Sequence, residues 1–238
     1  MQVVTSALRK GLRWAAYVFV AAVALFLVVQ LWFLGHVLYW VNHNPESTRF
    51  MELRLETLRA KRPNVKLAHQ WVEYKYISLQ LKRAIIAAED GKFIDHEGFD
   101  WEGIQRALDK NQKQGRVVAG GSTITQQLAK NLFLSGERSF IRKGQEALIT
   151  AMLELCMDKR RIFEIYMNVV EWGEGIFGAE AAARHYFGVP AAKLSDEQAA
   201  RLAAMLPRPR FFQRNPQSNY LAEYSAIILE RMPGSRVP

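Results

Sequence analysis

The chain has 238 residues, half of them hydrophobic, with a formal net charge of +9 and one cysteine. This length suits one sizeable core, or one domain preceded by a membrane segment, and a single cysteine excludes an intramolecular disulfide. Cys156 lies in an apolar helical pattern, so we expect it in the core. The basic residues are not interleaved with a base-stacking motif, which argues against nucleic acid as a partner and favours anionic lipid headgroups or phosphates.

The first element is an apolar run without a formal charge, which we expect to form a transmembrane anchor at residues 14–40. About 20 residues of helix cross the ~30 Å hydrocarbon layer, so this run is long enough to span it. Arg9, Lys10 and Arg13 precede it without an acidic residue, which predicts a cytoplasmic N-terminus at residues 1–13. The alternative is a cleavable signal peptide, but the run is longer than usual and bulky residues stand at the expected cleavage site.

Residues 41–70 are expected to form a juxtamembrane linker to a soluble domain at residues 71–238. Within the linker, residues 48–61 alternate charges with apolar side chains in an amphipathic helix pattern, which Pro63 stops. Residues 71–77 alternate enough to predict a short strand or extended segment, with no second convincing strand to pair with it.

From residue 78 onward the pattern is helical nearly to the end of the chain. Ser78 is predicted to cap a helix at residues 79–88, which places Glu89 and Asp90 at its C-terminal end. A carboxylate there meets the negative end of the helix macrodipole, which opposes its ionisation. Residues 109–119 predict a basic loop.

The next helix is predicted to begin near Ser122, whose hydroxyl is a natural N-cap. Thr123, Gln127 and Lys130 are spaced i, i+4, i+7, so they are expected to share one polar face. The back of that helix would pack through Leu128. This arrangement predicts a fixed row of hydrogen-bond donors.

Four further helical segments are expected after residue 141. The first, at residues 142–157, places Arg142 and Glu146 four apart on the same side. It also carries Leu148, Met152 and Leu155 along one face. The remaining segments are a helix at 159–168, a helix at 179–187 after a glycine-rich bend, and a helix opened by a capping box at Ser195 and closed by Pro207 and Pro209.

Several of these residue types suit bond-making chemistry, although each one has an ordinary structural interpretation as well. Two carboxylates in a cleft can divide acid and base duties, and a basic cluster can hold a leaving phosphate. Taken singly, however, Glu146 can be a solvated ion pair with Arg142, and His96 an ordinary surface or core histidine. The sequence contains no zinc-type spacing, no serine nucleophile elbow and no phosphate-binding glycine loop with its lysine.

The order of the motifs distinguishes these interpretations. Three motifs come first: Glu89-Asp90-x-x-Phe93-x-x-His96-x-Gly98, then Gly121 to Gln127 with Lys130 and Asn131, then Arg142-Lys143-x-x-Glu146. Two more follow at residues 159–168 and 175–188, with Phe163 and Met167 where leucine is usual and Glu174 where a small or neutral residue is expected. Together, across residues 71–209, they resemble the signatures of the peptidoglycan glycosyltransferases, a family shared by monofunctional enzymes and class A penicillin-binding proteins. With no room for a transpeptidase domain before residue 238, the chain resembles the monofunctional type.

The resemblance implies a mainly α fold, with a lysozyme-like helical catalytic domain after one N-terminal transmembrane helix. It implies that the protein polymerises lipid II into peptidoglycan glycan strands by inverting glycosyl transfer, with release of undecaprenyl pyrophosphate. The alternatives are a lysozyme-like enzyme that cleaves glycan and an inactive membrane-anchored cell-wall scaffold. An active enzyme of this family would lie in the inner membrane, with its N-terminus in the cytoplasm and its catalytic domain in the periplasm.

The resemblance also assigns roles to particular residues. Glu89 would be the general base, and Glu146 would orient the donor or assist the leaving group. No cofactor is obligatory, and a divalent cation, Mg²⁺ or Mn²⁺, is left open. The expected partners are lipid II, the growing lipid-linked strand and proteins of cell division or elongation. The expected substrate-binding residues are Asp90, Phe93, His96, Ser122, Thr123, Gln127, Lys130, Asn131, Arg142 and Lys143.

Overall fold

The computed structural model describes residues 2–116, 120–137 and 139–238, with side chains from residue 10 onward. The chain divides into two compact units, Met1–His43 and Asn44–Pro238. The first unit is a single helix, α1 (Gln2–Asn42), of which Lys10–Asn42 is long and apolar enough to cross a membrane. Its apolar side chains, such as Leu25 and Phe26, are exposed, as suits a membrane anchor. Of the three cations expected before the anchor, Arg9 lies outside the described side chains.

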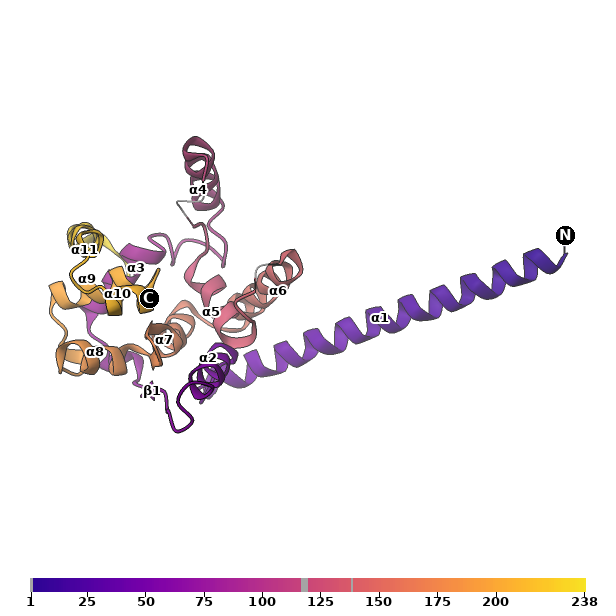
Figure 1. Ribbon diagram of the computed structural model, residues 1–238. Coiled ribbons are helices and arrows are strands. Elements are labelled where there is room, and N and C mark those ends of the chain that lie inside the picture. Colours follow the sequence, from indigo (N-terminus) through magenta and orange to yellow (C-terminus); the bar gives the residue numbers. More distant parts are fainter. Residues whose placement is uncertain (1, 117–119, 138) are drawn as a thin grey trace. The chain divides into compact units, whose positions relative to one another are not determined.

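The second unit is mainly helical, as expected, and carries a small sheet (Figure 1). Most of its helices are short and begin after a Ser, Thr or Asp whose side chain accepts a hydrogen bond from a backbone N–H of the first turn. In chain order the helices are α2 (Arg49–Arg59), α3 (Leu79–Glu89), α4 (Trp101–Gln114), α5 (Ile124–Phe133), α6 (Phe140–Cys156), α7 (Lys159–Val169), α8 (Ala179–Phe187), α9 (Asp196–Met205), α10 (Pro209–Arg214) and α11 (Asn219–Arg231).

The predicted caps at Ser78 and Ser195 are confirmed. The Ser78 hydroxyl accepts from the Leu81 N–H at the start of α3, and Ser195 forms a reciprocal capping box with Gln198 in α9. Helix α9 ends at Met205, before Pro207 and Pro209 as predicted, and Pro209 is the first residue of α10. Proline is well tolerated at that position, where its missing N–H has no partner inside the helix.

A three-stranded sheet was not predicted. In it, β1 (Ala68–His69) pairs in parallel with β3 (Ile176–Phe177), and β2 (Glu171–Gly173) pairs with β3 in the antiparallel sense. Strands of two or three residues are too short to show a periodicity. The predicted strand at residues 71–77 is wrong where a 3₁₀ turn forms, at Tyr74–Tyr76.

The core of this unit surrounds α7. Phe163 and Tyr166 of α7 are fully buried, and α7 packs against α5, α6 and α8. The helix α3 packs against α9 and α11, and α5 packs against α2, α6 and α7. The C-terminal end of α3 meets the middle of α5 where Gln127 bonds to Glu89, and the residues with chemical interest lie at that junction.

The loop predicted at residues 109–119 is wrong for residues 109–114, because α4 continues to Gln114 and ends at Gly115 in a left-handed conformation with φ of 62°. Asp109, the first residue of this segment, accepts a hydrogen bond from the Gln105 side chain one helical turn earlier, at 2.8 Å. Residues 117–119 lie outside the described part of the chain.

The apolar face predicted for residues 142–157 points outward from α6. Leu148 is 42% exposed and Leu155 is 86% exposed, whereas Ile149 and Leu153 face the core. Cys156 is half-buried at the end of this helix and not in the core as expected. Thus α6 packs through a different stripe from the one that the leucine spacing suggested.

Candidate active site

Glu89 is the last residue of α3, which stops there because Asp90 takes a non-helical backbone with φ of −159° and ψ of 74°. Glu89 as a whole is half-buried. The Gln127 side chain of α5 donates its Nε2–H to Glu89 Oε2 at 2.6 Å. Lys130 stands about one turn further along α5 and acts on Glu89 through its charge.

The environment of Glu89 raises its pKa. Burial is the largest cause, the Gln127 hydrogen bond and the Lys130 charge oppose it, and the Asp90 charge adds to it. The position at the C-terminal end of α3 acts in the same direction as burial. The carboxylate therefore has a stronger affinity for protons than an ordinary glutamate, which is the property that a general base needs.

Asp90 and His96 form a second set of contacts, which connects the end of α3 to the start of α5. His96 Nε2 lies 2.9 Å from Asp90 Oδ1, and the Ile124 N–H donates to Asp90 Oδ2 at 3.0 Å. Phe93 is fully buried and its ring contacts Phe163. These three residues were predicted to bind substrate, but their contacts are with the protein interior and with the first turn of α5.

Helix α5 begins one residue later than predicted. Thr123, and not Ser122, is the N-cap, because its hydroxyl accepts from the Gln126 N–H while the Gln126 side chain accepts from the Thr123 N–H. Thr123 Oγ1 also donates to the Gly98 carbonyl at 2.7 Å. Only Gln127 and Lys130 therefore remain on the predicted polar face, since the Thr123 hydroxyl bonds to the backbone of Gly98 and Gln126.

The second carboxylate, Glu146, lies in the second turn of α6 and is only 3% exposed. Arg142 Nη1 donates to its Oε2 at 2.6 Å, and Lys143 Nζ pairs with its Oε1. Arg142 Nε also donates to the Glu137 carbonyl at 2.5 Å. The pairing of Arg142 with Glu146 is thus confirmed. The carboxylate of the pair is buried, so the pair is not a solvated one.

Two cavities lie beside Gln127, the residue whose amide contacts Glu89. The large cavity has a volume of about 580 Å³ and the small cavity about 410 Å³, and both are lined by Phe50, Gln127, Lys130 and Gly136. The small cavity is completed by Ser122, Gln126, Arg142, Lys143 and Glu146. The large cavity is completed by Arg54, Asn131, Val170, Glu171, Leu206, Pro207, Arg208, Pro209, Arg210, Phe211 and Arg214.

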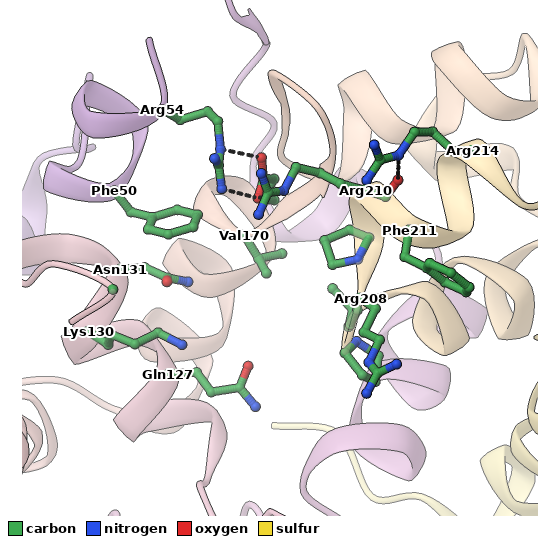
Figure 2. A pocket seen from close by; sticks show the side chains of 15 residues that line it. Phe50, Arg54, Gln127, Lys130, Asn131, Val170, Arg208, Arg210, Phe211 and Arg214 are labelled. Carbon is green, nitrogen blue, oxygen red and sulfur yellow. Dashed lines mark hydrogen bonds and ion pairs between the residues drawn. The ribbon is translucent and has the colours of Figure 1, made fainter. Parts of the chain in front are cut away.

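Figure 2 shows how the large cavity is walled, with Phe50, Asn131 and Lys130 on one side and Arg208 and Arg214 on the other. Glu89 is not among the lining residues of these two cavities, and Gln127 connects it to both. Of the predicted substrate-binding residues, the cavity walls bring together Ser122, Gln127, Lys130, Asn131, Arg142 and Lys143.

Lys130 connects the two carboxylates electrostatically. Burial lowers its pKa most, the Glu146 and Glu89 charges raise it, and the Arg142 and Lys143 charges lower it. Cations concentrated around a cavity stabilise phosphate oxygens, which guanidinium groups bind in a bidentate manner. Both cavities therefore suit anionic groups on their substrates.

The large cavity contains residues that the sequence interpretation missed. Arg54 donates to both oxygens of Glu171, at 2.8 and 3.1 Å, and Arg210 Nε lies 3.8 Å from the same carboxylate. Burial raises the pKa of Glu171, and the Arg54 and Arg210 charges oppose the rise. The sequence signal for the Arg208 and Arg210 wall of this cavity is the run Pro207-Arg208-Pro209-Arg210.

Comparison with known proteins gives consistent results. The family model described as Transglycosylase matches residues 56–233. The chain is 61% identical over 226 residues to the biosynthetic peptidoglycan transglycosylase of Dechloromonas aromatica strain RCB, which covers 95% of this chain and 98% of that protein. It is 59% identical over 231 residues to the protein of the same name from Janthinobacterium sp. strain Marseille, covering 97% of this chain and 99% of that protein.

Proposed function

This chain belongs to the transglycosylase family and is a peptidoglycan glycosyltransferase, and from that premise we propose that it polymerises lipid II into glycan strands with release of undecaprenyl pyrophosphate. The observation that carries the proposal is Glu89, a carboxyl of raised pKa, connected through Gln127 to two cavities lined by cations. The lysozyme-like helical fold predicted from the sequence agrees with the family.

In the proposed reaction Glu89 accepts the proton of the acceptor sugar's 4-hydroxyl. The freed oxygen electron pair attacks the anomeric carbon of the growing strand and inverts it from α to β. The bond from that carbon to the phosphate oxygen breaks, and its electron pair leaves with the pyrophosphate. No covalent enzyme intermediate forms, because the attacking oxygen belongs to the acceptor.

The departing pyrophosphate gains negative charge in the transition state, so preorganised cations accelerate this step. Lys130 lines both cavities and Arg142 lines the small one, which supports placing the leaving group between them. Glu146 binds Arg142 and Lys143 directly and would hold their charged ends in place. Its role would therefore be to orient cations and not to exchange protons.

The residues around Glu146 do not fit a divalent cation in this arrangement. Both of its oxygens are paired with protein cations, which would compete with a metal ion for the carboxylate. We therefore propose a reaction without an obligatory cofactor, in which Lys130, Arg142 and Lys143 supply the positive charge.

The helix α1 would keep the catalytic unit at the membrane, where both lipid-linked substrates are confined. Lys10 and Arg13 precede its apolar stretch, which supports a cytoplasmic N-terminus and a catalytic unit on the periplasmic side of the inner membrane. Proteins of cell division or elongation are proposed partners. The relatives' name, biosynthetic, favours synthesis over the alternatives of glycan cleavage or an inactive scaffold.

The deciding experiment incubates the full-length protein in detergent with labelled lipid II or with finished glycan. We expect consumption of lipid II, formation of polymer and release of undecaprenyl pyrophosphate. Consumption of finished glycan would support the cleaving alternative. A folded protein that consumes neither would support the scaffold.

A further inference from the structure

A fully buried tyrosine stands behind the amide that contacts Glu89. Tyr166 of α7 is 0% exposed, and its hydroxyl donates to Gln127 Oε1 at 3.1 Å. The other end of the same amide, Nε2, donates to Glu89 Oε2 at 2.6 Å. A continuous path of two hydrogen bonds therefore joins α7, α5 and α3.

The direction of this path follows from the chemistry of its members. A carboxylate can only accept hydrogen bonds, so it requires the N–H end of the Gln127 amide. The amide oxygen must then face a donor, and the Tyr166 O–H supplies one. Without that hydroxyl the Gln127 amide can flip, which would place its oxygen next to the Glu89 carboxylate.

We propose that Tyr166 is a positioning residue for Glu89, because its hydroxyl fixes the Gln127 amide with the N–H facing the carboxylate. The inference rests on the proposed function, since it takes Glu89 as the proton acceptor. Tyr166 lines neither of the two cavities and acts only through Gln127.

The electrostatic surroundings support this role. Burial first, and then the Glu89 and Asp90 charges, raise the pKa of Tyr166 well above its usual range, so its O–H remains a donor at any working pH. The groups that face Glu89 are Asp90 beside it, Gln127 and Lys130 of α5, Tyr166 of α7 and Tyr224 of α11. Only Gln127 and Lys130 among them lower the pKa of Glu89.

Loss of the oriented amide would therefore remove one of the two influences that keep Glu89 ionised. The pKa of Glu89 would rise, and a larger fraction of the enzyme would hold a protonated base at a given pH. A packing role for Tyr166 makes no such prediction, since removal of one hydroxyl oxygen from the interior would change stability without moving a catalytic pKa.

The test compares Tyr166→Phe with the wild type in the full-length protein, using labelled lipid II over a range of pH. We expect kcat to fall about five- to tenfold, the scale of one neutral hydrogen bond, with KM nearly unchanged. We also expect the acid limb of kcat/KM to move to higher pH. Tyr186→Phe is the matched control, because its hydroxyl donates to the Trp172 carbonyl at 2.8 Å, and its acid limb should not move.

A double-mutant cycle identifies the route of the effect. If Tyr166 acts through Gln127, adding Tyr166→Phe to Gln127→Ala should cause no further loss. Wild-type kcat and an unmoved acid limb in Tyr166→Phe would overturn the inference, and so would additive losses in the double variant. Should Tyr166→Phe fail to fold, 3-fluorotyrosine at position 166 keeps the ring and makes the hydroxyl a stronger donor. The acid limb should then move to lower pH, and an unmoved limb overturns the inference.

Glu89→Gln, measured in the same assay, separates this inference from the proposed function. An active Glu89→Gln enzyme contradicts the assignment of the general base and removes the premise. An inactive Glu89→Gln enzyme beside a wild-type-like Tyr166→Phe enzyme contradicts only the positioning role.

Discussion

The two carboxylates of the site occupy opposite environments. Within the described residues Glu89 forms no direct ion pair, and its nearest partner is the neutral Gln127 amide, whereas Glu146 is paired with two cations. The pKa of Glu89 is raised chiefly by burial. The same residue type can thus serve for proton transfer at one place and for charge positioning at another, because its neighbours separate the two tasks.

The strongest way to test this division is Glu89→Gln. The amide keeps the size of the side chain but cannot accept the proton, so we expect polymerisation of lipid II to fall by two or more orders of magnitude. Glu102→Gln on the exposed face of α4 serves as the control and should retain activity. Near wild-type synthesis by Glu89→Gln would show that another group accepts the proton.

Lys130→Ala tests the cation that lies between the two carboxylates. We expect turnover of lipid II to fall about ten- to hundredfold, because a preorganised charge facing the leaving pyrophosphate would be lost. Lys110→Ala, which removes an exposed lysine from α4, is the matched control. Unchanged turnover in Lys130→Ala would assign the leaving group to other cations, such as those of the large cavity.

The pH dependence of stability tests the raised pKa of Glu89 independently of catalysis. A carboxyl whose folded pKa is raised stabilises the fold at low pH, and this contribution is lost as the pH rises through the folded pKa. Glu89→Gln should therefore raise Tm at pH 8 by a few degrees and leave it nearly unchanged at pH 4. Thermal unfolding followed by circular dichroism measures both values, and an equal Tm at pH 8 would contradict the raised pKa.

The smallest effect is expected from removal of divalent cations. Because Glu146 is already paired with Arg142 and Lys143, polymerisation in excess chelator should stay within about twofold of the untreated rate. The measurement is the rate of polymer formation with and without EDTA, using magnesium-saturated EDTA as the control. A loss of more than tenfold would show that the protein cations do not suffice.

The sequence predicted most helices of the second unit because their caps and periodicity are local signals. Ser78 and Ser195 each indicate a helix start within the next four residues. The order of the motifs predicted that Glu89, Lys130 and Glu146 belong to one site. The contacts that separate the two carboxylates are not local. The bond from Gln127 to Glu89 joins residues 38 positions apart, and no periodicity reports on it.

The failures have the same origin. Ser122 and Thr123 are both good caps, and the Asp90 and Gly98 contacts, far along the chain, determine that Thr123 is used. The arginines of the large cavity were missed because Arg54 and Arg210 meet only through Glu171. The stripe at Leu148 and Leu155 gave the wrong buried face for α6, because leucine spacing alone does not show which face meets α5.

The hydrogen bonds that Asp90 and Gly98 make to the start of α5 affect how genetic screens of this protein would be interpreted. Asp90 and Gly98 hold the first turn of the helix that carries Gln127, and a methyl group at Gly98 would lie 2.7 Å from Thr150 Cγ2. A selection for loss of cell-wall synthesis would therefore recover substitutions at these two positions as well as at Glu89. Such variants would displace Gln127 without removing a group that contacts the reacting sugars. Measuring how much folded protein each variant yields would separate them from variants at Glu89.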